Sequence, residues 1–110
     1  MQLWLLRQRF RTYCEAVCYV NKSGEGVILD RSVYSDWVFA ENSRRDGTIS
    51  PEGFDYYSKL RTHMLKSLPD PTLVLYLDVR AEECFRRIRE VRKRDCEMGI
   101  PLEVGMYAEE

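Results

Sequence analysis

The sequence predicts an α/β fold in which two parallel β-strands are flanked by about four helices. Two short apolar runs, residues 27–30 and 72–79, have the length and the β-branched content of buried strands. A strand, a long helical crossover and a second strand are the order typical of a parallel sheet. Two strands make an incomplete sheet, so we expect the chain to be part of a larger domain.

The first helix is expected over residues 3–20, where apolar side chains recur at helical spacing. The second is expected over residues 33–42, and Ser32 is suited to cap its first turn. The apolar positions of the first helix are Leu3, Leu6, Phe10, Tyr13, Val17 and Val20.

The third helix is expected over residues 51–68. Ser50 can cap it, Pro51 suits its first position, and Pro69 prevents its continuation. The apolar spacing of residues 81–93 predicts a fourth helix after the second strand.

Composition excludes several classes of protein. The 110 residues contain 17 Lys and Arg against 18 Asp and Glu, so no global charge favours nucleic acid as a partner. The longest apolar run, residues 73–77, is too short for a transmembrane helix, so we expect no membrane span. The four cysteines lack the spacing of zinc ligands, and a reduced, intracellular protein is the default interpretation.

A charged rim is expected where the first strand ends, because ligands of open parallel sheets bind beyond the carboxyl ends of the strands. Asp30, Arg31 and Ser32 occupy this position. The Asp30 carboxylate is a suitable ligand for Mg²⁺, and the Arg31 guanidinium is suited to a phosphate. A simple Asp–Arg ion pair between strand and helix explains the same residues equally well.

A second cationic cluster lies near the end of the fourth helix. Arg86 and Arg87 are expected on a solvated helix face. Arg92 and Arg94 lie where the helical pattern fades, so a loop that closes over a nucleotide is an alternative for them. No G-x-x-x-x-G-K-[ST] motif occurs in the 110 residues, so none of them forms a phosphate-binding P-loop.

Two motifs carry a resemblance to a known family. Residues 26–36 (GVILDRSVYSD) resemble the D/E-R-S segment of the deoxyribonucleoside kinases, and residues 92–102 (RKRDCEMGIPL) resemble their arginine-rich lid. The resemblance implies a partial P-loop kinase-like parallel sheet, formed by one partial domain over residues 1–110. It further implies transfer of a phosphoryl group from ATP, with Mg²⁺, to the 5′-hydroxyl of a deoxynucleoside, in a homodimer. Such enzymes serve nucleotide salvage.

The resemblance also assigns roles to single residues. Asp30 matches the acid associated with the metal, and Arg31 the arginine at the 5′-oxygen; both are therefore candidate catalytic residues. Gln8 is a possible counterpart of a glutamine that reads the base, although Arg9 competes for that position. The remaining matches are Asp36 for the base, Glu97 for the sugar 3′-hydroxyl, and Arg92 and Arg94 for the ATP phosphates.

Two alternatives to a kinase remain. The segments GEGVILDRS and SDWVF also resemble an accessory subunit of respiratory complex I that has the same fold. Arg92, Arg94 and Glu97 favour the kinase, because a purely structural protein does not need arginines that grip phosphate. A non-catalytic module for nucleoside binding or dimerisation, through residues 3–20 and 51–67, is a weaker alternative. The compartment is expected to be the cytoplasm or the mitochondrion.

The chain by itself is expected to have negligible phosphoryl-transfer activity. In the family the P-loop and the general base precede the region that this sequence resembles, and without a P-loop nothing positions the β- and γ-phosphates of ATP. A coupled kinase assay on the purified 110-residue chain tests this expectation, and normal turnover would contradict it.

Overall fold

The computed structural model describes residues 1–94, in which helices are the regular elements. They are α1 (Gln2–Ser23), α2 (Val33–Arg45), α3 (Pro51–Lys66), α4 (Ala81–Arg87) and the π-helical turn η1 (Ile88–Arg92). The chain divides into two compact units, Met1–Asp70 and Pro71–Glu110, and each is described by itself. The single partial domain expected over residues 1–110 stays a prediction.

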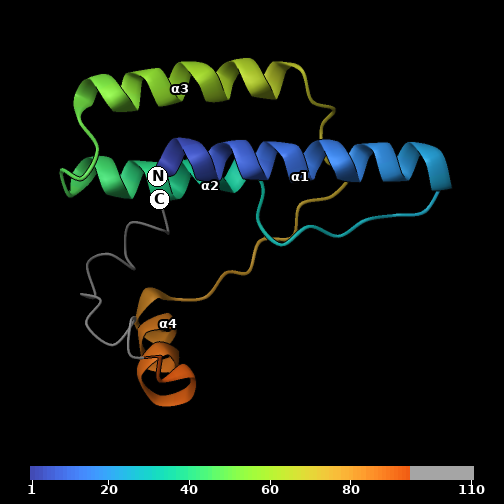
Figure 1. Ribbon diagram of the computed structural model, residues 1–110. Helices are drawn as coiled ribbons and strands as arrows, with labels where there is room; N and C mark the ends of the chain where they lie inside the picture. Colours follow the sequence, from blue (N-terminus) through green and yellow to red (C-terminus); the bar gives the residue numbers. More distant parts are fainter. Residues whose placement is uncertain (95–110) are drawn as a thin grey trace. The chain divides into compact units, whose positions relative to one another are not determined.

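The three helices of the first unit pack side by side. In Figure 1, α2 runs back along α1, and α3 then returns in the direction of α1. Leu6 of α1, Val33 and Ala40 of α2 and Tyr57 of α3 form the buried centre. This core is small, so the polar contacts between the helices also matter. Partly buried apolar side chains extend the core: Phe10, Phe54, Leu60, Met64, Leu65 and Leu68.

Local signals determine where the helices begin and end. The Ser32 Oγ accepts from the Tyr34 N–H at 3.2 Å, and Ser35 Oγ accepts from the Ser32 N–H at 2.8 Å, which is a reciprocal capping box. The Ser50 Oγ accepts from the Gly53 N–H at 3.1 Å. These two caps confirm the starts predicted for α2 and α3. Gly24 ends α1 in the left-handed region, at φ 73°, where its N–H donates to Val20 O.

The predicted parallel sheet is wrong: residues 1–94 contain no strand and form a helical structure. The two segments expected as strands are extended coils with exposed apolar side chains; Ile28 is 95% exposed and Leu77 is 85% exposed. A strand must pair its N–H and C=O groups with a neighbour, whereas a helix pairs them within itself. In the described part of the chain these two segments do not pair, so their β-branched composition alone does not produce a sheet.

The second unit contains α4 and η1, which together correspond to the helix predicted over residues 81–93. Arg86 and Arg87 both bond to Glu83 at 2.8 Å on a solvent-facing surface, as expected for a charged helix face. These two guanidinium groups lower the pKa of Glu83 to about 2. Within residues 1–94, no helix is both long enough and apolar enough to cross a membrane.

Replacing Ser32 by Ala should lower the free energy of unfolding by about 1 kcal/mol, because the first turn of α2 loses its side-chain cap. Urea denaturation followed by circular dichroism measures the change. Ser58→Ala, inside α3, is the matched control and should change the free energy by less than about 0.5 kcal/mol. Equal effects of the two substitutions would contradict the importance of the capping box.

Candidate functional site

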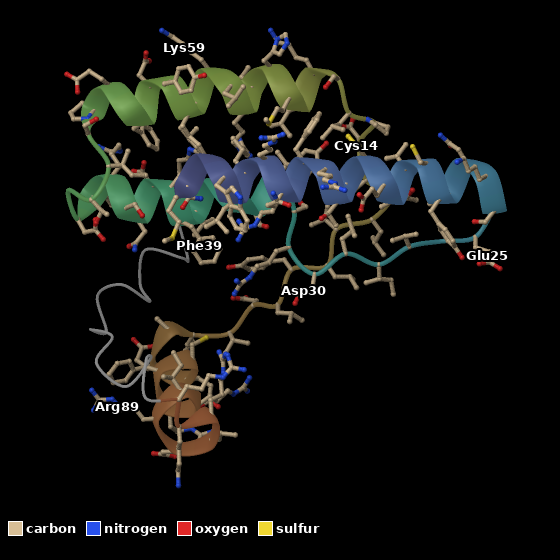
Figure 2. The ribbon with its side chains drawn as sticks, in the orientation of Figure 1. Cys14, Glu25, Asp30, Phe39, Lys59 and Arg89 are labelled. Carbon is tan, nitrogen blue, oxygen red and sulfur yellow. The ribbon has the colours of Figure 1, made fainter. Side chains whose placement is uncertain are left out.

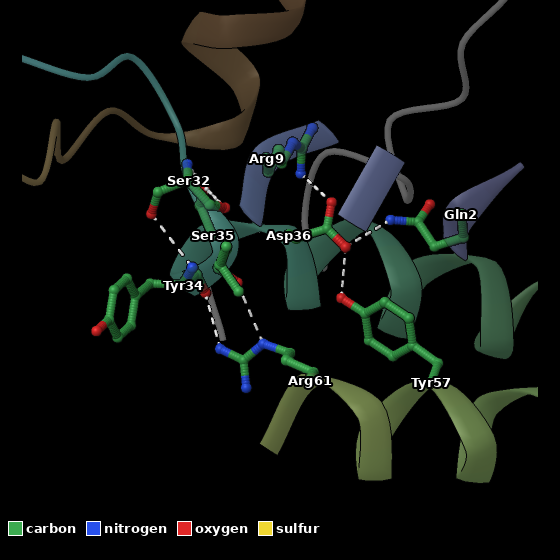
Figure 3. Close-up of polar contacts among 9 residues, drawn as sticks. Gln2, Arg9, Ser32, Tyr34, Ser35, Asp36, Tyr57 and Arg61 are labelled. Atoms are coloured by element: carbon green, nitrogen blue, oxygen red, sulfur yellow. Dashed lines mark hydrogen bonds and ion pairs between the residues drawn. The ribbon is translucent and has the colours of Figure 1, made fainter. Parts of the chain in front are cut away.

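The carboxylate of Asp36 is the centre of the candidate site. Asp36 lies in the first turn of α2 and is fully buried. Its Oδ1 forms an ion pair with Arg9, while its Oδ2 accepts from Gln2 Nε2 at 2.9 Å and from the Tyr57 hydroxyl at 2.5 Å (Figure 3). A buried charge is tolerated when it is paired and hydrogen-bonded, and all three partners are donors.

The helix geometry explains why these partners meet. Gln2 and Arg9 are seven residues apart in α1, which is about two turns, so both lie on the face that packs against α2. Tyr57 comes from α3, where its side chain is part of the buried core. Burial raises the pKa of the Tyr57 phenol well above its usual range, and the bond to Asp36 raises this pKa further. The hydroxyl therefore stays protonated at neutral pH and donates a hydrogen bond to Asp36.

Two arginine side chains lie over an aromatic ring of α2. Phe39 of α2 is labelled in Figure 2, and this residue is 39% exposed. The Arg9 Cζ lies 5.1 Å from the centre of this ring and the Arg31 Cζ lies 4.8 Å from it. Such cation–π contacts hold guanidinium groups in defined places. The arrangement brings an aromatic ring, hydrogen-bond donors and positive charge together.

The backbone at Arg31 is unusual, because φ is +64° at a residue other than glycine. This left-handed conformation costs about 1–2 kcal/mol for an L-amino acid. It turns the chain between Asp30 and the Ser32 cap. Asp30 is exposed on the coil immediately before α2 (Figure 2).

Arg61 of α3 forms hydrogen bonds with the first residues of α2. Its Nε donates to Val33 O at 3.2 Å and its Nη2 to Tyr34 O at 3.1 Å. These bonds tie the backbone at the start of α2 to α3 (Figure 3). The position of the start of α2, with Arg31 just before it and Asp36 in its first turn, therefore depends on α3.

The site residues predicted from the sequence lie in both units of the chain. Asp30, Arg31 and Asp36 lie within one turn of the start of α2, although Asp30 and Arg31 are exposed and Asp36 is buried. Gln8 is half-buried on α1, but the glutamine that contacts Asp36 is Gln2. Arg92 belongs to η1 and Arg94 follows it in the second unit, whereas Glu97 lies outside the described residues.

Sequence reasoning missed three partners of Asp36, namely Gln2, Arg9 as an ion-pair partner, and Tyr57. The seven-residue spacing of Gln2 and Arg9 was a usable signal, since it places two polar side chains on one helix face. Tyr57 gave no comparable signal, because it fits the apolar pattern of α3. Nowhere in residues 1–94 do three His, Cys, Asp or Glu side chains come together as a metal site.

The Arg9→Ala substitution should lower the free energy of unfolding by about 3 kcal/mol, because it leaves the buried Asp36 carboxylate without its cation. Urea denaturation gives the value. Arg11→Ala provides the control: the Arg11–Glu15 pair lies on the same helix but is exposed, so its loss should cost less than about 1 kcal/mol. Similar costs for both substitutions would show that the Arg9–Asp36 pair does not stabilise the fold.

Comparison with known proteins identifies the family. The family model for deoxynucleoside kinases matches residues 1–107. A deoxyguanosine kinase of Dictyostelium discoideum is 54% identical over 102 residues, which are 93% of this chain and 35% of the relative. A deoxyadenosine kinase of the same organism is 31% identical over 94% of this chain and 40% of its own length.

A further relative has another function in its name. Subunit 10 of the NADH dehydrogenase [ubiquinone] 1 alpha subcomplex, mitochondrial, from Bos taurus is 34% identical over 82% of this chain and 26% of its own length. The chain thus spans about a third of the deoxyguanosine kinase and about a quarter of this subunit. The family match covers almost all of the chain and confirms the resemblance read from its two motifs. The chain belongs to the deoxynucleoside kinase family.

Proposed function

We propose that this chain supplies the nucleoside-binding part of a deoxynucleoside kinase that acts on purine deoxynucleosides. The observation that carries this proposal is the buried Asp36 carboxylate, held by Gln2, Arg9 and Tyr57 beside the exposed ring of Phe39. A nucleobase is planar and presents both donors and acceptors on its edge. An aromatic ring next to the partly buried Gln2 amide and Arg9 guanidinium is complementary to it, and the buried Asp36 carboxylate holds these two groups in place. The names of the two Dictyostelium relatives favour a purine.

Phosphoryl transfer requires groups beyond the base site. In the proposed reaction a phosphoryl group passes from ATP to the 5′-hydroxyl of the nucleoside. Arg31 would orient the 5′-oxygen and neutralise charge on the transferred group, and its place over the Phe39 ring supports this role. Arg92 and Arg94 would contact the ATP phosphates, and Glu97 the sugar 3′-hydroxyl.

Asp30 is the residue suited to hold Mg²⁺. Mg²⁺ commonly binds one or two carboxylates together with substrate phosphates and water, and Asp30 is an exposed carboxylate next to Arg31. The ion would neutralise phosphate charge when bound. The adjacent Arg31 backbone strain fits a residue whose side chain must be held in a particular direction.

Family membership also implies that the chain acts as part of a homodimer in the cytoplasm or the mitochondrion. Exposed apolar side chains on α1, such as Trp4 and Leu3, provide surface for a second copy. The second candidate function is a structural role in respiratory complex I, which the bovine relative favours. A structural subunit does not need a nucleobase site, so a measurement of nucleoside binding distinguishes the kinase from the structural alternative.

The wild-type chain should bind 2′-deoxyguanosine, and Gln2→Ala should weaken this binding by about tenfold, because one polar contact with the base is lost. Isothermal titration calorimetry measures both dissociation constants. Gln8→Ala is the matched control on the same helix and should leave the dissociation constant within about twofold.

Three results would count against the proposal. Absence of binding by the wild-type chain would contradict a nucleoside site in this region. A larger loss in Gln8→Ala than in Gln2→Ala would move the base contact to Gln8. Stable association of the chain with the respiratory complex, together with absence of nucleoside binding, would favour the structural alternative.

A further inference from the structure

We propose that Arg61 is a positioning residue for Arg31, the side chain that would orient the 5′-oxygen and neutralise charge on the transferred phosphoryl group. The inference rests on the proposed function, because it concerns the same reaction. It assigns to α3 the task of fixing the turn that carries Arg31, so that this guanidinium has a defined place relative to the groups of α1 that would hold the base.

Arg61 reaches α2 through two hydrogen bonds to consecutive carbonyl groups. Its Nε donates to Val33 O at 3.2 Å and its Nη2 donates to Tyr34 O at 3.1 Å (Figure 3). A guanidinium is a rigid plane whose donors point in fixed directions, so two bonds from one plane restrain both the position and the orientation of the carbonyl groups. Both bonds are partly buried, which strengthens them relative to bonds on an open surface.

These bonds give α2 a second directional point of attachment. The first is Asp36, whose carboxylate is held by donors from α1 and α3. The apolar contacts of the core are non-directional, so hydrogen bonds determine how α2 is oriented. A helix that is bonded at one point can tilt about it, whereas a second attachment three residues earlier, at Val33, fixes the direction of its first turn.

Arg31 lies two residues before Val33 and has a backbone that needs outside support. Its φ of +64° is unfavourable for an L-amino acid, and such a residue persists only where its surroundings impose the conformation. The hydroxyls of Ser32 and Ser35 fix the turn within α2 itself. Arg61 ties the same turn to α3, so it can hold the strained residue in place relative to the rest of the first unit.

The charge of Arg61 argues against a role in stabilising α2 alone. The first turn of a helix is the positive end of its dipole, where anions are favourable and cations are unfavourable. Helix stability by itself would therefore favour an acidic or a neutral side chain in this place. What the guanidinium supplies instead is direction, through two N–H donors in one plane.

The position of Arg31 matters because a nucleoside has a nearly constant length. Its base and its 5′-oxygen are joined through one sugar ring, so the distance between them varies little. Gln2 and Arg9, which would contact the base, belong to α1, whereas Arg31 immediately precedes the cap of α2. The way in which α2 is held therefore sets the spacing between the two parts of the site, and a small displacement of a reacting group has a large effect.

The contribution of a 5′-phosphate to binding tests the proposal. The wild-type chain should bind 2′-deoxyguanosine 5′-monophosphate more tightly than 2′-deoxyguanosine, and Arg31→Ala should remove most of this difference. Arg61→Ala should reduce the ratio of the two dissociation constants by about fivefold, while the dissociation constant of the nucleoside changes by less than about twofold. Titration calorimetry with both ligands gives the two constants. An unchanged ratio in Arg61→Ala would overturn the proposal, because a merely structural role weakens both ligands equally.

Two further variants separate geometry from charge. Arg61→Lys keeps the charge, but one ammonium group cannot hold two carbonyl groups in a plane, so we expect no recovery of the ratio. Lys59→Ala is the matched control, because it removes a cation of the same helix whose pair with Asp55 is exposed, and it should leave the ratio within about twofold. Full recovery in Arg61→Lys, or an equal loss in Lys59→Ala, would show an effect of charge alone and overturn the proposal.

The strain at Arg31 separates this proposal from the proposed function. Arg31→Gly and Arg31→Ala both remove the side chain, but glycine accepts a positive φ, so urea denaturation should give Arg31→Gly an unfolding equilibrium constant about fivefold smaller. When Arg61→Ala is added to both variants, the turn can relax, and the difference should fall below about twofold.

A difference that persists in the Arg61→Ala background would overturn the positioning role even if both ligands bind. If the wild-type chain binds neither ligand, the proposed function fails, and loss of the difference would still support control of the Arg31 turn by Arg61.

Discussion

Burial of the Asp36 carboxylate is the constraint on which the first unit depends. A fully buried charge is costly unless donors surround it, and here the donors come from both helices that flank α2. Arg9 and Gln2 hold it from α1, and Tyr57 holds it from α3. The contact that joins the three helices is thus also the centre of the candidate site.

The surroundings of Asp36 show how a small core can carry a precise polar site. Four fully or nearly fully buried residues form its centre, and the capping box and the Arg61 bonds to the α2 backbone add directional contacts around it. These bonds restrict the start of α2 in position and orientation. Arg31, with its left-handed backbone, projects from this restricted turn onto the Phe39 ring.

In contrast to this packed site, the coil of residues 72–79 exposes its apolar side chains. Leu73, Leu75 and Leu77 are more than two-thirds exposed, which is unfavourable for large aliphatic side chains in water. Family members are considerably longer than this chain, and the matched region spans about a third of the Dictyostelium deoxyguanosine kinase. The helices of the first unit bury their own apolar faces against one another, whereas these coils have no such neighbour within residues 1–94.

Most helical boundaries could be predicted because their causes are local. Ser32, Ser50 and Pro51 act within one turn of their own positions, and the same holds for Gly24, although α1 continues to Ser23 rather than ending at residue 20. The family could also be recognised, since residues 26–36 and 92–102 are continuous motifs. The predicted strands were wrong because a strand needs a partner to pair with, and the composition of a segment does not supply one.

The sequence by itself therefore determined the helices, the caps and the family, as well as Asp30, Arg31 and Asp36 as candidates near the start of α2. Only the tertiary structure decided that Asp36 is buried, that Gln2 rather than Gln8 is the glutamine in contact with it, and that Tyr57 is its third donor. The physical reason is the range of the interactions. A cap or a motif is encoded by neighbouring residues, whereas the packing of the helices selects the partners of the buried charge, which lie 21 to 34 residues from Asp36 in the chain.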